Sequence, residues 1–319
     1  MKKIYVSLLL IELIISTSVK AQDPHFTQFY ANPLYLNPAF AGSAICQRII
    51  LNHRTEWPGI AGTYVSTSAS FDRFVPGIKS GIGILAMNDR AGEGTLKTNS
   101  IGLVYAKQFA INRTVSINAG ARATYGQKTI DWDKLTFGDM INPQRGFVYN
   151  TNETRGLNKK SYADFSAGIL VVSKRYYAGF AADHLTEPDE GFKDGSKLPL
   201  KYTAHAGALI PIDKGKETSV SPNILYQKQQ DFEQLNFGVY FTKGPLVGGF
   251  WYRQAHKNPD SFILLLGVQH GMLKFGYSYD ITVSRLSNVS AGSHEISCGL
   301  QFECKKTTKK IRPDICPSF

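Results

Sequence analysis

The chain has 319 residues and a formal net charge of +11, with 16 tyrosines, 19 phenylalanines, 29 glycines and only four cysteines. Beyond the N-terminal region it holds no run of roughly 18 apolar residues, which excludes a helical membrane protein. The positive charge does not indicate a nucleic-acid partner, because part of it lies in an export signal and a terminal basic tail.

The first residues have the form of a secretory signal. Lys2 and Lys3 precede an apolar run from Ile4 to Ser16, and Val19-Lys20-Ala21 supplies a small-residue cleavage site. The run falls short of the roughly 20 residues that a spanning helix needs. We therefore prefer a cleaved signal peptide over residues 1–21 to a retained membrane anchor.

Residues 22–44 form a periplasmic segment rich in proline and aromatic side chains. Asn32-Pro33 and Asn37-Pro38 exclude a regular helix or central strand, since each proline removes a donor and restrains the residue before it. One hypothesis places the segment as a plug inside a barrel lumen or across its mouth. The alternative is a packed turn beneath the first strand. Its aromatic residues are candidates for partner binding: Phe26, Phe29, Tyr30, Tyr35 and Phe40.

Residues 45–302 consist of short segments that alternate in polarity. Between Leu273 and Thr282, for example, apolar and aromatic residues occupy one face, and Lys274, Ser278 and Asp280 share the other. Such alternation is typical of a transmembrane barrel with a lipid face and a polar lumen. Arg122 is expected to point inward, because an arginine facing lipid at the midplane costs about 2 to 4 kcal/mol.

About fourteen such segments can be counted, an even number, as in bacterial single-chain barrels. Only helices and closed sheets satisfy every backbone polar group in lipid, so the sequence predicts an all-β fold, a closed antiparallel outer-membrane β-barrel. The predicted strands are 45–56, 63–71, 81–88, 98–109, 114–129, 161–172, 175–185, 200–212, 219–228, 234–243, 246–254, 261–270, 272–282 and 293–302.

The connections between these strands are asymmetric. Those after even-numbered strands are mostly tight, such as 111–113 and 244–245, whereas those after odd-numbered strands include 130–160, 186–199 and 283–292. Short periplasmic turns and long outer loops are usual in the outer membrane of Gram-negative bacteria, so we expect both termini in the periplasm. A soluble β-sandwich gives no reason for this one-sided pattern.

Four cysteines lie near the ends of the barrel region and in the basic tail, residues 303–319. The periplasm favours disulfides, and neighbouring first and last strands would bring Cys46 and Cys304 to one rim. The sequence leaves three connectivities open, of which we favour those that tie down the tail. A zinc site is the alternative, but no CxxC pair or close histidine supports it. The candidates are Cys46, Cys298, Cys304 and Cys316.

The sequence predicts no catalytic, cofactor or metal site. His184, His205 and His294 have no nucleophile elbow near them, so a serine hydrolase is not supported. Acidic residues of the predicted outer loops match no twelve-residue calcium loop and are interpreted as solvated charge. These are Asp131, Asp133, Asp189, Glu190 and Asp194.

Two long end motifs carry a family resemblance. Asp23–Gly42, DPHFTQFYANPLYLNPAFAG, and Tyr279–Phe302, YDITVSRLSNVSAGSHEISCGLQF, resemble the PorP/SprF family of type IX secretion outer-membrane proteins. Asn52-His53-Arg54 leading to Trp57-Pro58 and the terminal Cys316–Phe319 are similar to that family as well. The resemblance spans the mature chain and implies a barrel that assists the type IX secretion system of Bacteroidetes.

The resemblance implies two kinds of partner besides outer-membrane lipid. Some members hold or present one secreted protein, typically a large adhesin with a C-terminal export domain used in gliding or adhesion. Others are associated with the periplasmic ring of the secretion machinery. Trp132, in the predicted outer loop 130–160, is a further candidate for partner binding. The alternative hypothesis is a porin-like channel for small solutes, which a polar lumen permits.

Overall fold

The architecture was taken from a computed structural model of the chain. The residues that it describes are 23–44, 46–60, 62–92, 94–112, 114–192, 196–213, 215, 217–255, 258–283 and 290–302. Within these ranges no helix is both long enough and apolar enough to cross a membrane.

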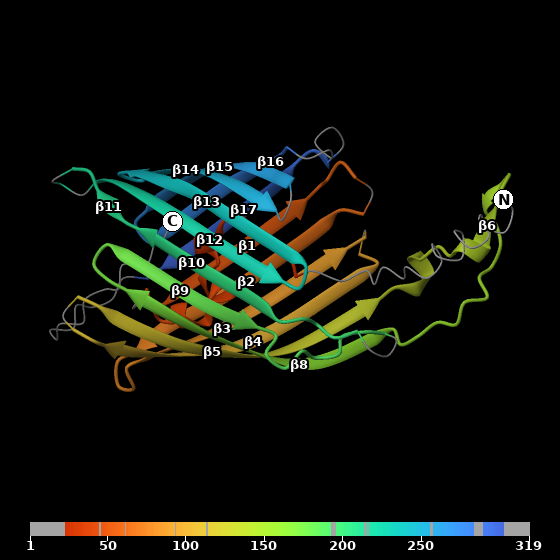
Figure 1. Cartoon of the computed structure of the whole chain (residues 1–319), viewed down its shortest axis with the longest axis horizontal. Helices are drawn as coiled ribbons and strands as arrows, with labels where there is room; N and C mark the ends of the chain where they lie inside the picture. Colours follow the sequence, from red (N-terminus) through yellow and green to blue (C-terminus); the bar gives the residue numbers. More distant parts are fainter. Residues whose placement is uncertain are drawn as a thin grey trace, which may run out of the picture.

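The described residues form one antiparallel sheet that closes on itself (Figure 1). Its fourteen long strands are β1 (Arg48–Glu56), β2 (Tyr64–Val75), β3 (Ser80–Ala91), β4 (Leu96–Ala110), β5 (Ser116–Ile130), β8 (Lys159–Val172), β9 (Tyr176–Asp183), β10 (Lys201–Ala208), β12 (Thr218–Gln229), β13 (Phe232–Lys243), β14 (Leu246–Ala255), β15 (Asn258–His270), β16 (Leu273–Thr282) and β17 (Ser293–Gln301). The prediction of about fourteen strands in a closed barrel is confirmed.

Two pairings show the closure. β1 pairs with β17 from Arg48↔Gln301 to Glu56↔Ser293, and this seam joins the first strand to the last. β10 pairs with β12, and the short β11 (Ile210–Pro211) continues along β12 after β10 ends. The predicted strand 200–212 therefore corresponds to two segments separated by an irregularity at Leu209.

The predicted alternation of the strands is observed. On β5 the side chains of Ser116, Asn118 and Arg122 are buried, whereas Ala119 and Ala121 are exposed on the outer face. Arg122 points inward, as expected, and donates to Asp183 and to the backbone carbonyl of Leu34. On β5 the charged side chain therefore lies on the inner face and small apolar side chains lie on the outer face, as a strand that faces lipid requires.

The connections are as one-sided as the sequence predicts. Tight turns such as 76–79 and 244–245 lie at one end of the barrel, which we call the tight-turn end. The connection from β5 to β8 leaves the other end, the long-loop end, and reaches well beyond the barrel (Figure 1). It contains η3 (Trp132–Lys134), η4 (Gly138–Met140) and the hairpin of β6 (Ile141–Asn142) and β7 (Gly146–Phe147).

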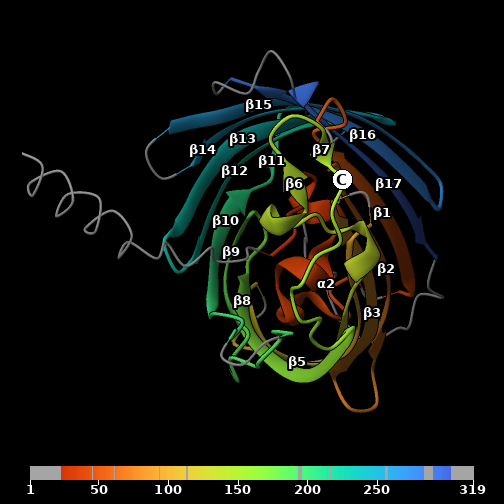
Figure 2. The ribbon, with the colours of Figure 1, turned by 90° about the vertical axis from the view of Figure 1, so that its right-hand side faces the viewer.

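Residues 23–43, which we call the luminal segment, lie inside the barrel, where Figure 2 shows their helical turns at the centre. They form η1 (Phe29–Ala31), α2 (Pro33–Leu36) and η2 (Pro38–Phe40). The inner wall facing them is not uniformly polar, because Leu225, Ile263 and Leu265 point inward and are buried. The period of two predicts which face each residue occupies. Whether an inward residue is polar or apolar depends on its contacts with the luminal segment.

Replacing Leu264 by arginine tests the assignment of the outer face. Leu264 lies mid-strand on β15 and is 47% exposed on the outer face, so Leu264→Arg should destabilise the folded barrel in liposomes by about 2 to 4 kcal/mol. Leu246→Arg is the matched control, because Leu246 is outward-facing at the β14 end beside a turn and should cost about 0 to 1 kcal/mol. Denaturant titrations measure both values. Equal costs at the two depths would contradict the assignment.

Candidate functional site: the filled lumen

The path of the luminal segment follows from its Asn-Pro pairs. Pro33 and Pro38 each begin a helical turn, where a missing N–H costs nothing. The Asn37 side chain caps the second of these turns by accepting from the Ala39 N–H at 2.9 Å. Its amide group also donates to the carbonyl of Ile169 at 3.1 Å. One asparagine therefore stops the chain from continuing as a helix and fixes it to the barrel wall.

Aromatic side chains of the luminal segment pack against the inner wall. Phe29 contacts Trp251 edge to face with ring centroids 5.3 Å apart, and Tyr30 contacts Tyr177 at 5.6 Å. Phe40 stacks on His205 at 5.3 Å. Burying large aromatic side chains contributes roughly 1.5 to 3 kcal/mol each, so these contacts hold the segment in place.

The backbone of the segment approaches the wall closely where the wall carries glycine. A Cβ at Gly120 would lie 2.4 Å from the backbone nitrogen of Ala39, and one at Gly81 would lie 1.9 Å from the carbonyl oxygen of Ala41. Neither gap leaves room for a side chain. The inner faces of β3 and β5 are thus shaped around the luminal segment.

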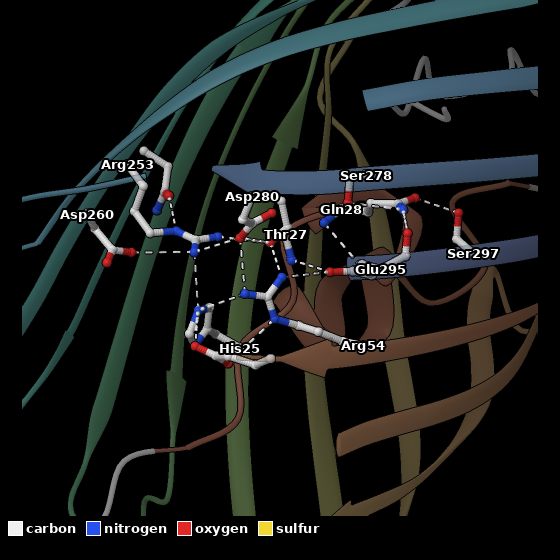
Figure 3. A network of polar contacts seen from close by, with 12 residues as sticks. His25, Thr27, Gln28, Arg54, Arg253, Asp260, Ser278, Asp280, Glu295 and Ser297 are labelled. Carbon is white, nitrogen blue, oxygen red and sulfur yellow. Dashed lines mark hydrogen bonds and ion pairs between the residues drawn. The ribbon is translucent and has the colours of Figure 1, made fainter. Parts of the chain in front are cut away.

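A buried charge cluster binds the start of the segment (Figure 3). Arg54 of β1 and Arg253 of β14 both contact Oδ2 of Asp280, at 3.0 and 2.9 Å. The Thr27 hydroxyl donates to the same oxygen at 2.7 Å. Thr27 lies between two guanidiniums and a carboxylate, so it joins the luminal segment to a network of side chains from three separate strands.

Glu295 of β17 provides the second half of this cluster. Its carboxylate accepts from the backbone N–H groups of Thr27 at 2.5 Å and of Gln28 at 3.2 Å. The Gln28 side chain donates in turn to the carbonyl of Glu295 at 3.0 Å and accepts from the Ser297 hydroxyl at 2.6 Å. A short loop inside a barrel would otherwise leave these backbone donors without partners.

His25 lies between the two arginines as a neutral group. Burial, and then the positive charges of Arg253 and Arg54, hold the pKa of His25 well below its ordinary value. Its Nε2 atom faces Arg253 at 3.3 Å and Arg54 at 3.5 Å, where a neutral ring nitrogen acts as an acceptor. Its 3.8 Å approach to Glu56 is accordingly not an ion pair.

Asp23, the first described residue, is bound at the long-loop end. Its Oδ2 atom lies 2.7 Å from Nε2 of His184 and 3.3 Å from Nζ of Lys201, and its backbone N–H donates to Gln229. His184 contacts Asp164 through its other ring nitrogen at 2.8 Å. We call Asp23, His184, Lys201 and Asp164 the latch.

Electrostatics explain the protonation of the latch. Burial lowers the pKa of His184, but Asp23 and Asp164 outweigh this and raise it to about 10, so the ring donates to both carboxylates. Burial raises the pKa of Asp23, yet His184 and Lys201 together hold it below its ordinary value. The latch at neutral pH therefore consists of two cations and two carboxylates.

The other end of the luminal segment is fixed near the tight-turn end. Asp72 accepts from the N–H of Gly42 at 2.8 Å and pairs with Arg48 at 2.9 Å. The segment therefore runs along the lumen from the long-loop end to the tight-turn end before β1 begins. Gln301, by contrast, lies at the tight-turn end with Arg48, so Asp23 and Gln301 do not share one end of the barrel.

The structure separates the residues proposed for partner binding. Phe26, Phe29, Tyr30 and Phe40 are buried inside the barrel, and Tyr35 is half-buried against Lys201. Trp132 lies far from them in the sequence and in the fold, in η3 of the long connection. It lines a polar cavity of about 230 Å³ together with Asp131, Asp133 and Arg155.

The cysteines differ from one another. Cys46 is disulfide-bonded, and Cys304 and Cys316 lie outside the described residues. Cys298 is a free thiol that alternates onto the outer face of β17, next to Leu51 and Phe275. A lipid-facing position offers no cysteine partner, so Cys298 leaves the set of disulfide candidates.

The remaining histidines and acidic residues have ordinary partners. Within the described part of the chain, His184 bonds to carboxylates, His205 to Asn37 and His294 to Tyr277 rather than to a serine. The loop carboxylates of Asp133, Asp189 and Glu190 pair with Arg155, Lys160 and Lys128, respectively, while Asp194 lies outside the described residues. No group of three or more His, Cys, Asp or Glu among the described residues is arranged to hold a metal ion.

Sequence reasoning missed the charged residues that bind the luminal segment. Arg54 belongs to the first strand, whereas Asp280 and Glu295 belong to the last two, so only the closure of the ring brings Arg54 to the two carboxylates. The available signal was their inward position in the alternation, since an inward charge needs a partner inside the lumen. That rule identifies candidates but does not say which charges meet.

Adding a methyl group at Gly120 should displace the luminal segment. Gly120→Ala places a Cβ against the backbone of Pro38 and Ala39, whereas Gly248 has open space around the same position. We expect the unaltered barrel and Gly248→Ala to conduct little in planar bilayers, and Gly120→Ala to conduct several-fold more. The same conductance from both variants would show that the segment does not close the lumen.

The latch should loosen in alkali. Because the folded-state pKa of His184 lies above its ordinary 6.5, its stabilising contribution is complete below that pH and is lost as the pH rises through about 10. The pKa of Asp23 is lowered, so its stabilising contribution is complete above the ordinary value of 3.8 and is lost only in stronger acid. Hydrogen exchange of residues 23–28, corrected for the intrinsic rate, should lose protection between about pH 6.5 and 10. His184→Gln should remove this dependence, and an unchanged profile in that variant would contradict the assignment.

The solved structures that resemble this chain are distant from it in sequence. No curated protein matched the chain. Solved barrels with a similar course include the CymD monoaromatic hydrocarbon channel (12% identity, TM-score 0.48, covering 86% of this chain and 93% of that one). Omp33 of Acinetobacter baumannii (7%, 0.47, 81% and 100%) and a FadL homologue of Pseudomonas aeruginosa (13%, 0.45, 84% and 93%) are similar to the same extent.

A family model gives the decisive match. The model described as "Type IX secretion system membrane protein PorP/SprF" matches residues 18–300, from before the luminal segment to the last strand. The chain therefore belongs to the PorP/SprF family of type IX secretion system membrane proteins.

Proposed function

We propose that this outer-membrane barrel assists type IX secretion by attaching or presenting a secreted partner, such as an adhesin used in gliding or adhesion, at the cell surface. The observation that carries the proposal is the family match over residues 18–300. The filled lumen supports it, since a barrel whose interior is occupied by its own chain is better suited to holding a partner than to passing solutes. The porin-like alternative requires an open lumen.

In the proposed orientation the tight turns face the periplasm and the long loops face outward. Gln301 then faces the periplasmic ring proteins of the secretion machinery. Asp23 lies inside the lumen near the outer end. The proposal thus assigns the tight-turn end to the machinery and the long-loop end to the secreted partner.

The connection from β5 to β8 offers a surface for that partner. Several large apolar side chains beyond the barrel end are about half exposed, although no lipid reaches them there: Ile141, Phe147, Val148, Tyr149 and Leu157. Exposed apolar groups outside the membrane commonly mark a protein interface. Trp132 lies in the same connection, which makes it the candidate from the sequence that best fits this role.

Affinity purification tests the proposal. The tagged barrel, solubilised in detergent from its own membranes, should recover a secreted adhesin-like protein with a C-terminal export domain, together with periplasmic ring components. Replacing Phe147, Val148 and Tyr149 with serine should lower recovery of the secreted protein at least tenfold and leave the ring components bound. Removing three aromatic or apolar contacts from an interface commonly has an effect of this size.

The matched control replaces three outward residues of similar exposure on the barrel with other apolar residues, as in Leu264→Ile, Leu266→Ile and Phe262→Leu. This control should recover both kinds of partner. The proposal fails if neither partner is recovered with the unaltered barrel and if a strain lacking the barrel still displays its surface proteins normally.

A further inference from the structure

A cavity of about 610 Å³ lies above the luminal segment, toward the long-loop end. Its floor is made by Asp23, Pro24, His25 and Tyr35, so the start of the luminal segment separates it from the rest of the lumen. Cavities of roughly 300 to 1,000 Å³ are the usual size of ligand sites in proteins. We call this cavity the vestibule.

One side of the vestibule departs from the polar character of a barrel lumen. Leu85, Met87 and Ala91 of β3 and Leu96 of β4 all line it from inward positions. The luminal segment covers the inner wall at other apolar positions, such as Ile263 and Leu265, but it leaves this group facing the cavity. An apolar patch of this kind is suited to an apolar ligand group.

The latch forms another part of the vestibule wall. His184 and Lys201 present two buried cations. Asp164 of β8 pairs with His184, and the carboxylate that contacts both cations, Asp23, comes from the luminal segment itself. Since an unpaired buried cation is costly, the pair requires a carboxylate, but nothing in the contact requires that carboxylate to belong to this chain. Asp23 therefore occupies an anion site that opens onto the cavity.

Hydroxyl groups line the space between these two features. Ser66, Thr98, Ser100 and Thr124 point into the vestibule, along with the phenol of Tyr162. A fatty acid has one polar end and gives such hydroxyls nothing to bond along its tail. A peptide carries a donor and an acceptor at each residue, which hydroxyls can satisfy because they both donate and accept.

We propose that the vestibule binds the C-terminal end of a partner polypeptide, with its terminal carboxylate taking the place of Asp23 between His184 and Lys201 and its apolar side chains against Leu85, Met87 and Leu96. This inference rests on the proposed function and names the part of the partner that enters the lumen. Binding frees Asp23 and with it the start of the luminal segment.

Peptide binding to the purified barrel in lipid nanodiscs tests the inference. The probe is the fluorescein-labelled hexapeptide Gly-Ser-Ala-Val-Ile-Leu with a free C-terminal carboxylate, and the comparison is the same peptide with a C-terminal amide. Removing the competing anion with Asp23→Ala should strengthen binding of the free acid roughly tenfold or more. The amide should bind at least tenfold more weakly than the acid, to the unaltered barrel and to Asp23→Ala alike.

Charge variants locate the site. Lys201→Met should abolish the preference for the acid over the amide, and Lys201→Arg should retain most of it. Lys243→Met is the matched control, because Lys243 ends β13 beside the tight turn at the other end of the barrel and should bind like the unaltered barrel. Circular dichroism and the mass of the mature chain establish that each variant is folded and processed alike.

Three results would overturn the inference. Equal binding of the acid and the amide would rule out the carboxylate site, and direct binding of dodecanoate without any peptide binding would identify a fatty-acid site instead. Failure of both peptides to bind Asp23→Ala, while affinity purification still recovers the secreted partner, would refute the vestibule and leave the proposed function intact.

Discussion

The fold depends on the inability of a lipid bilayer to form hydrogen bonds with a polypeptide backbone. Every N–H and C=O of a spanning strand must find its partner in the protein, so the sheet has to close, as it does where β1 meets β17. Closure in turn creates an interior whose side chains contact neither lipid nor the packed core of a soluble domain. The remaining features of this protein are ways of filling and using that interior.

The luminal segment fills the interior although it cannot form a regular helix or strand. Its Asn-Pro pairs break it into short turns, and each turn leaves backbone groups that need partners. Glu295 supplies such a partner from the wall by accepting from the backbone of the segment, and the Asn37 side chain binds the segment to the wall by donating to the carbonyl of Ile169. Because the polar groups of both parts are satisfied only together, the segment and the barrel specify each other's position.

The sequence predicts the architecture well because the period of two is a local property. The inward position of Arg122 and the outward position of Leu273, Phe275 and Tyr277 follow from their neighbours alone. The interior cannot be predicted in the same way. Thr27 meets Asp280 across more than 250 positions, and the inward position of Ile263 can be apolar because an aromatic segment lies there to cover it. These contacts follow from the register of the closed ring, which single residues do not encode.

The seam of the barrel lies close to the charge cluster, and this links two events in its formation. β17 is the strand that closes the ring on β1, and it is also the strand that carries Glu295, the acceptor for Thr27 and Gln28. Arg54, on the other side of the seam, completes the same cluster. Pairing of β1 with β17 and docking of the luminal segment are therefore thermodynamically coupled, so each favours the other by the same free energy. A barrel that closed without the luminal segment would lack part of the attraction that holds its first and last strands together.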